Sequence, residues 1–67
     1  MKTVEMIGKW KDILIKETPK GFMEYYFNKD GSPCKISKAL VRKGGLFKTM
    51  DDVVKYNEKI GFKKVSA

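Results

Sequence analysis

Six positively charged side chains fall between residues 29 and 48, a segment that holds a single carboxylate, Asp30. The whole chain has fifteen Lys and Arg against eight Asp and Glu, a formal net charge of +7, and this segment alone carries +5. Lysine and arginine neutralise phosphates, and a sequence pI near 9.6 is typical of domains that bind polyanions. The expected nucleic-acid contacts are Lys35, Lys38, Arg42, Lys43 and Lys48. The alternative is a solvated strand face whose lysines discourage edge-to-edge aggregation.

Aromatic side chains gather just before this basic segment. Four of the six residues from Phe22 to Phe27 are aromatic, and Trp10 adds an indole upstream. Aromatic rings beside cations form the stacking surfaces of single-stranded nucleic-acid binders. Tyr25, Phe27 and Trp10 are therefore candidate stacking or interface residues. The alternative is that a small domain uses most of its rings as core.

Side-chain alternation along the aromatic segment leaves more apolar surface than one helix can cover. In an extended strand, Phe22 and Tyr26 share one face. The opposite face carries three further large side chains, those of Met23, Tyr25 and Phe27. We therefore expect one apolar face to remain for a partner or for a second copy of the protein.

Residue types that support catalysis are scarce. The chain has no histidine, the usual general base and the commonest metal ligand, and its single cysteine, Cys34, lacks a histidine to activate it. The adjacent carboxylates Asp51 and Asp52 are explained by the start of a helix without a metal. Gly44 and Gly45 match no phosphate-loop motif. We expect no enzyme, no catalytic residues, no metal site and no cofactor.

Length and hydropathy describe one folded domain. The 67 residues are 42% hydrophobic and 12% aromatic, which is too apolar for a disordered tail. No apolar run approaches the roughly 18 residues of a membrane span, and the first residues lack the apolar stretch of a signal peptide. A lone cysteine forms no internal disulfide. We expect a single domain over residues 1–67, cytoplasmic and without a membrane partner.

Two segments in the first half favour β-strands. Phe22–Phe27 is predicted as a strand because aromatic residues suit a pleated, half-buried surface. Trp10–Lys16 is short and β-branched at its centre, which also favours a strand. A helix from Val4 to Glu17 stays open as the competing interpretation. It depends on four apolar residues at helical spacing, Val4, Ile7, Trp10 and Leu14.

Turn residues then predict two hairpins. Asn28–Gly31 combines residues that tolerate turn geometry, so the chain is expected to return through a strand from Cys34 to Val41. The pair Gly44-Gly45 lies between Val41–Lys43 and Leu46–Lys48, which predicts a second hairpin.

A helix with defined ends follows. Thr49 is a good N-cap, Asp52 completes a capping-box-like pair, and Gly61 suits the position after the last turn. The expected apolar face, which Asn57 interrupts, consists of Met50, Val53, Val54 and Ile60. Residues 62–65 are a candidate for a short final strand. The predicted fold is α+β, an antiparallel sheet of three to four strands packed against one C-terminal helix.

The stretch from Tyr25 to Ile60 resembles the small sheet-plus-helix domains at the N-terminus of tyrosine-type integrases, which have the arm-site or AP2-like DNA-binding fold. The matching residues are Asn28–Gly31 as a strand turn and Phe47–Thr49 leading into a helix with an acidic first turn. The resemblance implies a three-stranded sheet in the DNA major groove. This chain departs from the pattern in its extra N-terminal segment and in having Arg42 as its only arginine, the residue type that most often reads guanine.

These features lead us to expect a small basic DNA-binding module that uses its sheet face, with DNA favoured over RNA, as an accessory protein of a phage, plasmid or other mobile element. About five phosphate contacts give a slope of about −4 to −5 for log affinity against log salt. The alternative is a protein-interaction module, such as an inhibitor of a host protein, with the aromatic face as hot spot and the lysines steering association. A homodimer that closes the aromatic face is compatible with either function.

Overall fold

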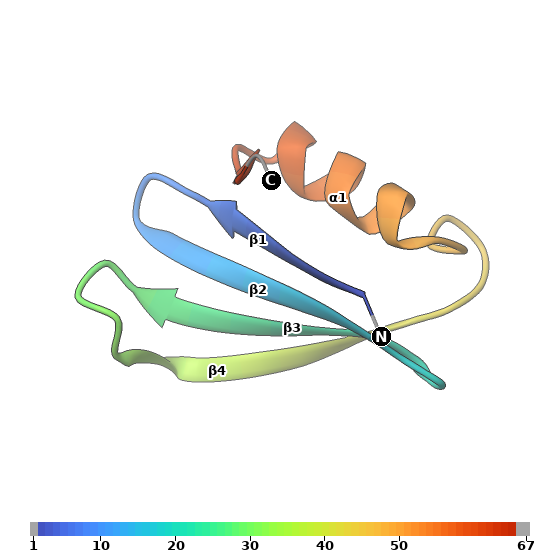
Figure 1. Ribbon diagram of the computed structural model, residues 1–67, viewed down its shortest axis with the longest axis horizontal. Helices are drawn as coiled ribbons and strands as arrows, with labels where there is room; N and C mark the ends of the chain where they lie inside the picture. Colours follow the sequence, from blue (N-terminus) through green and yellow to red (C-terminus); the bar gives the residue numbers. More distant parts are fainter. Residues whose placement is uncertain (1, 66–67) are drawn as a thin grey trace.

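Four antiparallel strands follow one another along the first two thirds of the chain and pair as sequence neighbours (Figure 1). In the computed structural model, which describes residues 2–65, they are β1 (Thr3–Ile7), β2 (Lys11–Thr18), β3 (Gly21–Asn28) and β4 (Pro33–Arg42). The helix α1 (Met50–Lys59) and the two-residue strand β5 (Lys63–Lys64) follow. Because β5 returns to pair with β1, the sheet order is β4-β3-β2-β1-β5.

The predicted fold class, an antiparallel sheet packed against one C-terminal helix, is confirmed. Over residues 2–65 the sheet has five strands, one more than the upper end of the prediction. The strand that the sequence analysis did not expect is β1, which lies inside the segment for which a helix from Val4 to Glu17 was considered. The interpretation of this segment as a helix is wrong, because the segment forms two strands joined by a tight turn.

Gly8 explains why the helical spacing of the N-terminal segment does not produce a helix. Its backbone N–H donates to the carbonyl oxygen of Lys11 at 2.9 Å, which closes the turn between β1 and β2. A Cβ atom at this position would lie 2.6 Å from both that oxygen and the ring of Phe62, so only glycine fits. Trp10, expected as the first residue of a strand, lies in this turn instead.

The turn between β3 and β4 forms as predicted. The backbone N–H of Gly31 donates to the carbonyl oxygen of Asn28 at 2.9 Å, and Gly31 has a positive φ of 89°. Asp30 Oδ1 accepts hydrogen bonds from the hydroxyl and backbone N–H of Ser32, which lower the pKa of its carboxyl group. Local polar residues therefore set the geometry of this turn.

The prediction of a second hairpin at Gly44-Gly45 is wrong. Strand β4 ends at Arg42, and the only pairing across Gly44-Gly45 in the described chain is an isolated bridge between Gly44 and Phe47. The segment after the glycines is too short to pair further, because Thr49 already caps the helix. Phe47 packs instead edge-on against the ring of Tyr56, with 5.4 Å between ring centroids.

Both ends of α1 are fixed by the predicted caps. The Thr49 side chain accepts from the backbone N–H of Asp52, and the Asp52 carboxylate accepts from the backbone N–H of Thr49, a complete capping box. At the other end, the backbone N–H groups of Gly61 and Phe62 donate to carbonyls of the last turn, as in a Schellman motif. The prediction that Ile60 belongs to the buried face of the helix is wrong. Ile60 follows the last helical residue and is 57% exposed.

The helix packs on one face of the sheet and closes the core there (Figure 1). The buried apolar residues come from β1–β3 and from the inward side of α1, and are Met6, Ile13, Ile15, Phe22, Met50, Val53 and Val54. No element within residues 2–65 covers the opposite face of the sheet. In the same part of the chain, no helix has the length and apolar character needed to cross a membrane.

Candidate nucleic-acid interface

The face of the sheet away from α1, which we call the open face, has an apolar centre. Cross-strand partners point to the same side of a sheet, so the register identifies its members. Tyr25 lies opposite Leu14, and Met23 lies opposite Leu40. The large apolar residues of the open face are Ile7, Leu14, Met23, Tyr25, Phe27 and Leu40. The sequence prediction that Met23, Tyr25 and Phe27 share a face remote from Phe22 is confirmed.

Cations border this apolar centre. Lys38 lies directly opposite Tyr25, and Arg42 lies opposite Gly21 at the end of β4. Lys16, on β2, lies opposite Met23. Three long cationic side chains therefore stand beside aromatic and aliphatic ones on a single surface.

Two carboxylates also belong to the open face. Asp12, opposite Phe27, forms an ion pair with Lys29 in the β3–β4 turn, with 2.6 Å between Lys29 Nζ and Asp12 Oδ1. Glu5 lies on β1, at the side of the sheet away from β4. Since Lys29 neutralises Asp12, positive charge dominates the part of the open face formed by β2, β3 and β4.

The five cations singled out from the sequence do not form one stripe. Lys38 and Arg42 lie on the open face, and Lys35 is exposed on the irregular first half of β4. Lys43 turns to the helix side, where its Nζ lies 3.3 Å from Glu17 Oε2 and 5.6 Å from the centroid of the Phe22 ring. Lys48 lies in the loop before α1. The expected placement of all these charges on paired strands is wrong for Lys43 and Lys48, because the second hairpin does not form.

Lys16 is the open-face cation that the sequence analysis missed. It belongs to β2, outside the densest run of positive charge. The signal was present in the alternation of the strand, since Leu14 and Lys16 are two residues apart and must share a face. Only the antiparallel register shows that this face is also that of Tyr25 and Lys38.

No family model, curated protein or solved structure matches this chain. The likeness to integrase arm-site domains therefore stays a prediction.

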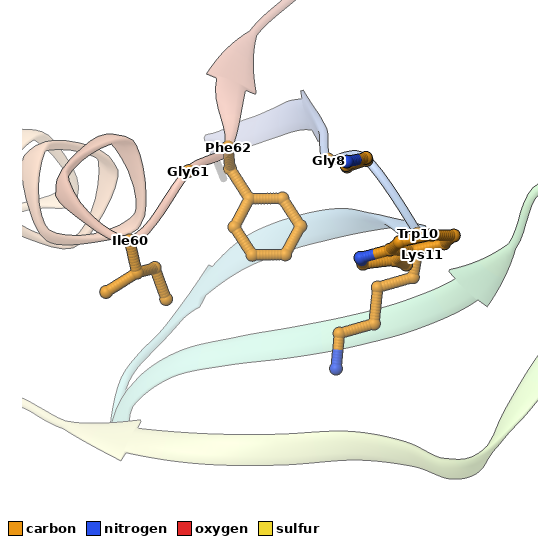
Figure 2. Close-up of a pocket in the computed structure, with 7 residues that line it drawn as sticks. Gly8, Trp10, Lys11, Ile60, Gly61 and Phe62 are labelled. Atoms are coloured by element: carbon orange, nitrogen blue, oxygen red, sulfur yellow. The ribbon is translucent and has the colours of Figure 1, made fainter.

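Trp10, the third aromatic candidate, lies apart from Tyr25 and Phe27. It is 80% exposed in the β1–β2 turn, with Lys9 Nζ 5.2 Å from the centroid of its ring. A cleft of about 500 Å³ is lined by Trp10, Phe62 and Ile60. Figure 2 shows these three side chains, with Ile60 at the end of α1. The structure thus brings together Tyr25 and Phe27 but not Trp10.

A buried polar network on the covered face ties α1 to β3. Glu24 is 7% exposed and Asn57 is 3% exposed. Asn57 Nδ2 donates to Glu24 Oε2 at 2.8 Å, and the Tyr26 hydroxyl donates to Glu24 Oε1 at 2.6 Å. Burial, reinforced by the hydrogen bond to Glu24 and by the charge of Glu24, raises the pKa of Tyr26. Asn57 interrupts the apolar helix face because it satisfies a carboxyl group 33 residues earlier in the chain.

Groups with reactive or metal-binding chemistry stay isolated in the described part of the chain. No three His, Cys, Asp or Glu side chains within residues 2–65 come close enough to hold a metal ion. Cys34 Sγ donates to Asn28 Oδ1 at 3.3 Å, and the carboxyl group of Glu24 is occupied by Tyr26 and Asn57. The chemistry that the open face offers is therefore charge and apolar contact.

Proposed function

We propose that this protein is a nucleic-acid-binding module that contacts DNA through the open face of its sheet. The observation that carries the proposal is the direct pairing of Lys38 with Tyr25, which sets a cation beside an aromatic ring on an uncovered surface. Lys16 and Arg42 extend the positive border along the same face. Phosphate contacts by such side chains supply most of the affinity of non-specific nucleic-acid binding.

Charge distribution favours the open face over the helix as the surface that meets phosphate. The outer side of α1 carries an ion pair between Lys55 and Asp51 at 3.1 Å, and its acidic first turn balances its lysines. On the open face, Lys16, Lys38 and Arg42 have no ion-pair partner among residues 2–65. The electrostatic attraction of a polyanion is therefore stronger at the open face of the sheet than at the outer side of the helix.

Salt dependence of binding measures the number of phosphates that are neutralised. Three cations, Lys16, Lys38 and Arg42, give an expected slope of about −2 to −3 for log affinity against log salt. This slope is shallower than the value expected if all five cations chosen from the sequence took part. Fluorescence anisotropy of a labelled oligonucleotide at several salt concentrations supplies the slope.

A pair of charge-matched variants locates the contact. We expect Lys38→Gln with Arg42→Gln to weaken binding at least about tenfold and to reduce the slope to about −1. The control, Lys55→Gln with Lys59→Gln, removes the same charge from α1 and should leave affinity within about twofold. Equal losses in both variants would mean diffuse electrostatic attraction rather than a site. Absence of binding to any nucleic acid at low salt would refute the function.

A second candidate function follows from the apolar part of the open face. Six large apolar residues on an uncovered surface also suit a protein partner, either a host protein that the chain inhibits or a second copy of the chain. Light scattering reports a mass of twice 7.7 kDa if two copies close their open faces on one another. A monomer that binds oligonucleotide contradicts the dimer.

A further inference from the structure

The apolar side chains of the open face are contiguous across β2, β3 and β4, and each of their two central rows ends in a lysine, Lys16 on β2 and Lys38 on β4. Leu14, Met23 and Tyr25 occupy the middle of β2 and β3, where the register places them side by side with Leu40. Recognition of duplex DNA in the major groove uses Arg, Asn, Gln or Lys aimed at base edges. In the regularly paired part of β2, β3 and β4, the open-face side chains of these types are Lys16, Lys38 and Arg42, and no Asn or Gln is among them.

This arrangement separates duplex from single-stranded ligands. A duplex presents phosphates on its outside and keeps the flat faces of its bases stacked inside, so the apolar centre would lie against phosphate and water without compensation. A single strand offers the flat faces of its bases to rings, while its phosphates reach cations a few ångströms away. The pattern of an apolar centre with a cationic border therefore matches a single strand.

We propose that the ligand of the open face is single-stranded nucleic acid, whose unpaired bases stack on Tyr25 and Phe27 while Lys16, Lys38 and Arg42 hold its phosphates. This inference rests on the proposed nucleic-acid-binding function and specifies its substrate class. It departs from the major-groove docking that the resemblance to integrase domains implies.

The spacing of the two rings suits successive bases. Tyr25 and Phe27 are two residues apart on one strand, so their Cα atoms are about 7 Å apart along β3. One base can lie over each ring without displacing the other. Lys38, opposite Tyr25, stands next to the first of these positions.

The second ring adjoins a hollow. A shallow cleft of about 530 Å³ is lined by Phe27 together with Ile7 and Leu14, and the ion pair of Asp12 and Lys29 lies at its margin. The apolar side chains offer contact to the face of a base, and the ion pair offers both a hydrogen-bond donor and an acceptor to its edge. The open face therefore has room for a base beyond the one over Tyr25.

The test compares three labelled ligands of equal length, about 12 nucleotides, in fluorescence anisotropy at fixed salt. They are an oligothymidine, a duplex of mixed sequence and a strand of abasic sites that keeps the phosphates but lacks bases. We expect the oligothymidine to bind at least about tenfold more tightly than either of the others, because stacking contributes about 1–3 kcal/mol per base and 1.4 kcal/mol is a tenfold change.

Variants of the two rings complete the test. Tyr25→Ala and Phe27→Ala should each weaken oligothymidine binding about tenfold, whereas Tyr25→Phe keeps the ring and should keep the affinity. Trp10→Ala is the matched control, since it removes an exposed aromatic residue that lies off the open face. Circular dichroism confirms that each variant is folded at the assay temperature.

The outcomes distinguish this inference from the function on which it rests. If the abasic strand binds as well as oligothymidine, or the duplex binds more tightly, stacking is refuted while nucleic-acid binding stands. If Tyr25→Ala and Phe27→Ala have no more effect than Trp10→Ala, the bases do not lie on these rings. If none of the three ligands binds, the proposed function itself fails.

Discussion

The two faces of β3 carry similar side chains, yet only one of them is closed by the helix. Phe22 and Tyr26 point toward α1, and Phe22 is fully buried, with 0% exposure. Tyr25 and Phe27 alternate with them and remain partly exposed on the open face. Residue type therefore does not decide burial in this strand. The decisive factor is the reach of a ten-residue helix, which covers one side of a sheet and no more.

The largest expected effect comes from removing the same kind of ring on either side of β3. Phe22→Ala should cost about 3–5 kcal/mol of unfolding free energy, which is the whole net stability of a domain this small. Phe27→Ala should cost about 1 kcal/mol, because its ring already contacts water. Urea unfolding followed by circular dichroism measures both values, and Phe22→Leu supplies a milder variant that stays folded. Equal losses would show that the open face is also closed in solution, for example by a second copy.

A smaller loss of unfolding free energy is expected when the polar network on the covered face of the sheet is broken. Asn57→Leu removes the hydrogen bond to Glu24 Oε2 and leaves that oxygen buried without its donor. We expect a loss of about 1–3 kcal/mol in urea unfolding.

The matched variant for this network is Asn57→Leu combined with Glu24→Leu. Both variants are made with Tyr26→Phe, because Glu24→Leu would otherwise leave the Tyr26 hydroxyl without its acceptor. Replacing both Asn57 and Glu24 then removes the unsatisfied oxygen as well as the bond, so this variant should be more stable than the one that carries Asn57→Leu without Glu24→Leu. The result opposite to our expectation, a double variant that loses the sum of the two single losses, would mean that Glu24 and Asn57 act independently.

The smallest effect concerns the cap that sets where the covering helix begins. The backbone N–H groups of Thr49 and Lys48 donate to Asp52 and lower the pKa of its carboxyl group. A lowered pKa in the folded state stabilises the protein above the ordinary value of about 3.9, and this stabilisation is lost as pH falls through the folded value. Asp52→Asn should therefore be less stable than the parent near neutral pH, with a difference that shrinks below about pH 4.

The control for the cap is the neighbouring carboxylate. Asp51 pairs with the side chain of Lys55 and makes no capping bond to the backbone, so Asp51→Asn should change stability less at neutral pH. Thermal unfolding between about pH 2 and pH 7 follows both variants. A difference between Asp52→Asn and the parent that stays constant over this range would show that the carboxylate does not cap the helix.

Local signals explain what could be predicted from the sequence. Thr49, Asp52 and Gly61 fix the ends of α1 through contacts within a few residues, and Asn28–Gly31 fixes the first predicted hairpin in the same way. The two faces of β3 follow from alternation alone, which is why Tyr25 and Phe27 could be assigned together to the face opposite that of Phe22.

What could not be predicted depends on partners far away in the chain. The ring of Phe62 leaves no space for a Cβ atom at Gly8. Lys43 forms an ion pair with Glu17, and Asn57 donates a hydrogen bond to Glu24. None of these pairs can be predicted until the sheet register and the helix position are known. For the same reason the candidate site changed its membership: Lys16 entered it through the register, and four predicted members left it, namely Lys35, Lys43, Lys48 and Trp10.

The order of elements along the chain has a consequence for folding. Strands β1–β4 pair with one another as sequence neighbours, so this meander uses only residues up to Arg42, whereas its cover, α1, lies in the following segment and ends at Lys59. Until the helix docks, Phe22 and Ile15 are as uncovered as Tyr25 and Phe27, and intermolecular association competes with helix docking. Refolding at high protein concentration should therefore lower the yield of folded monomer.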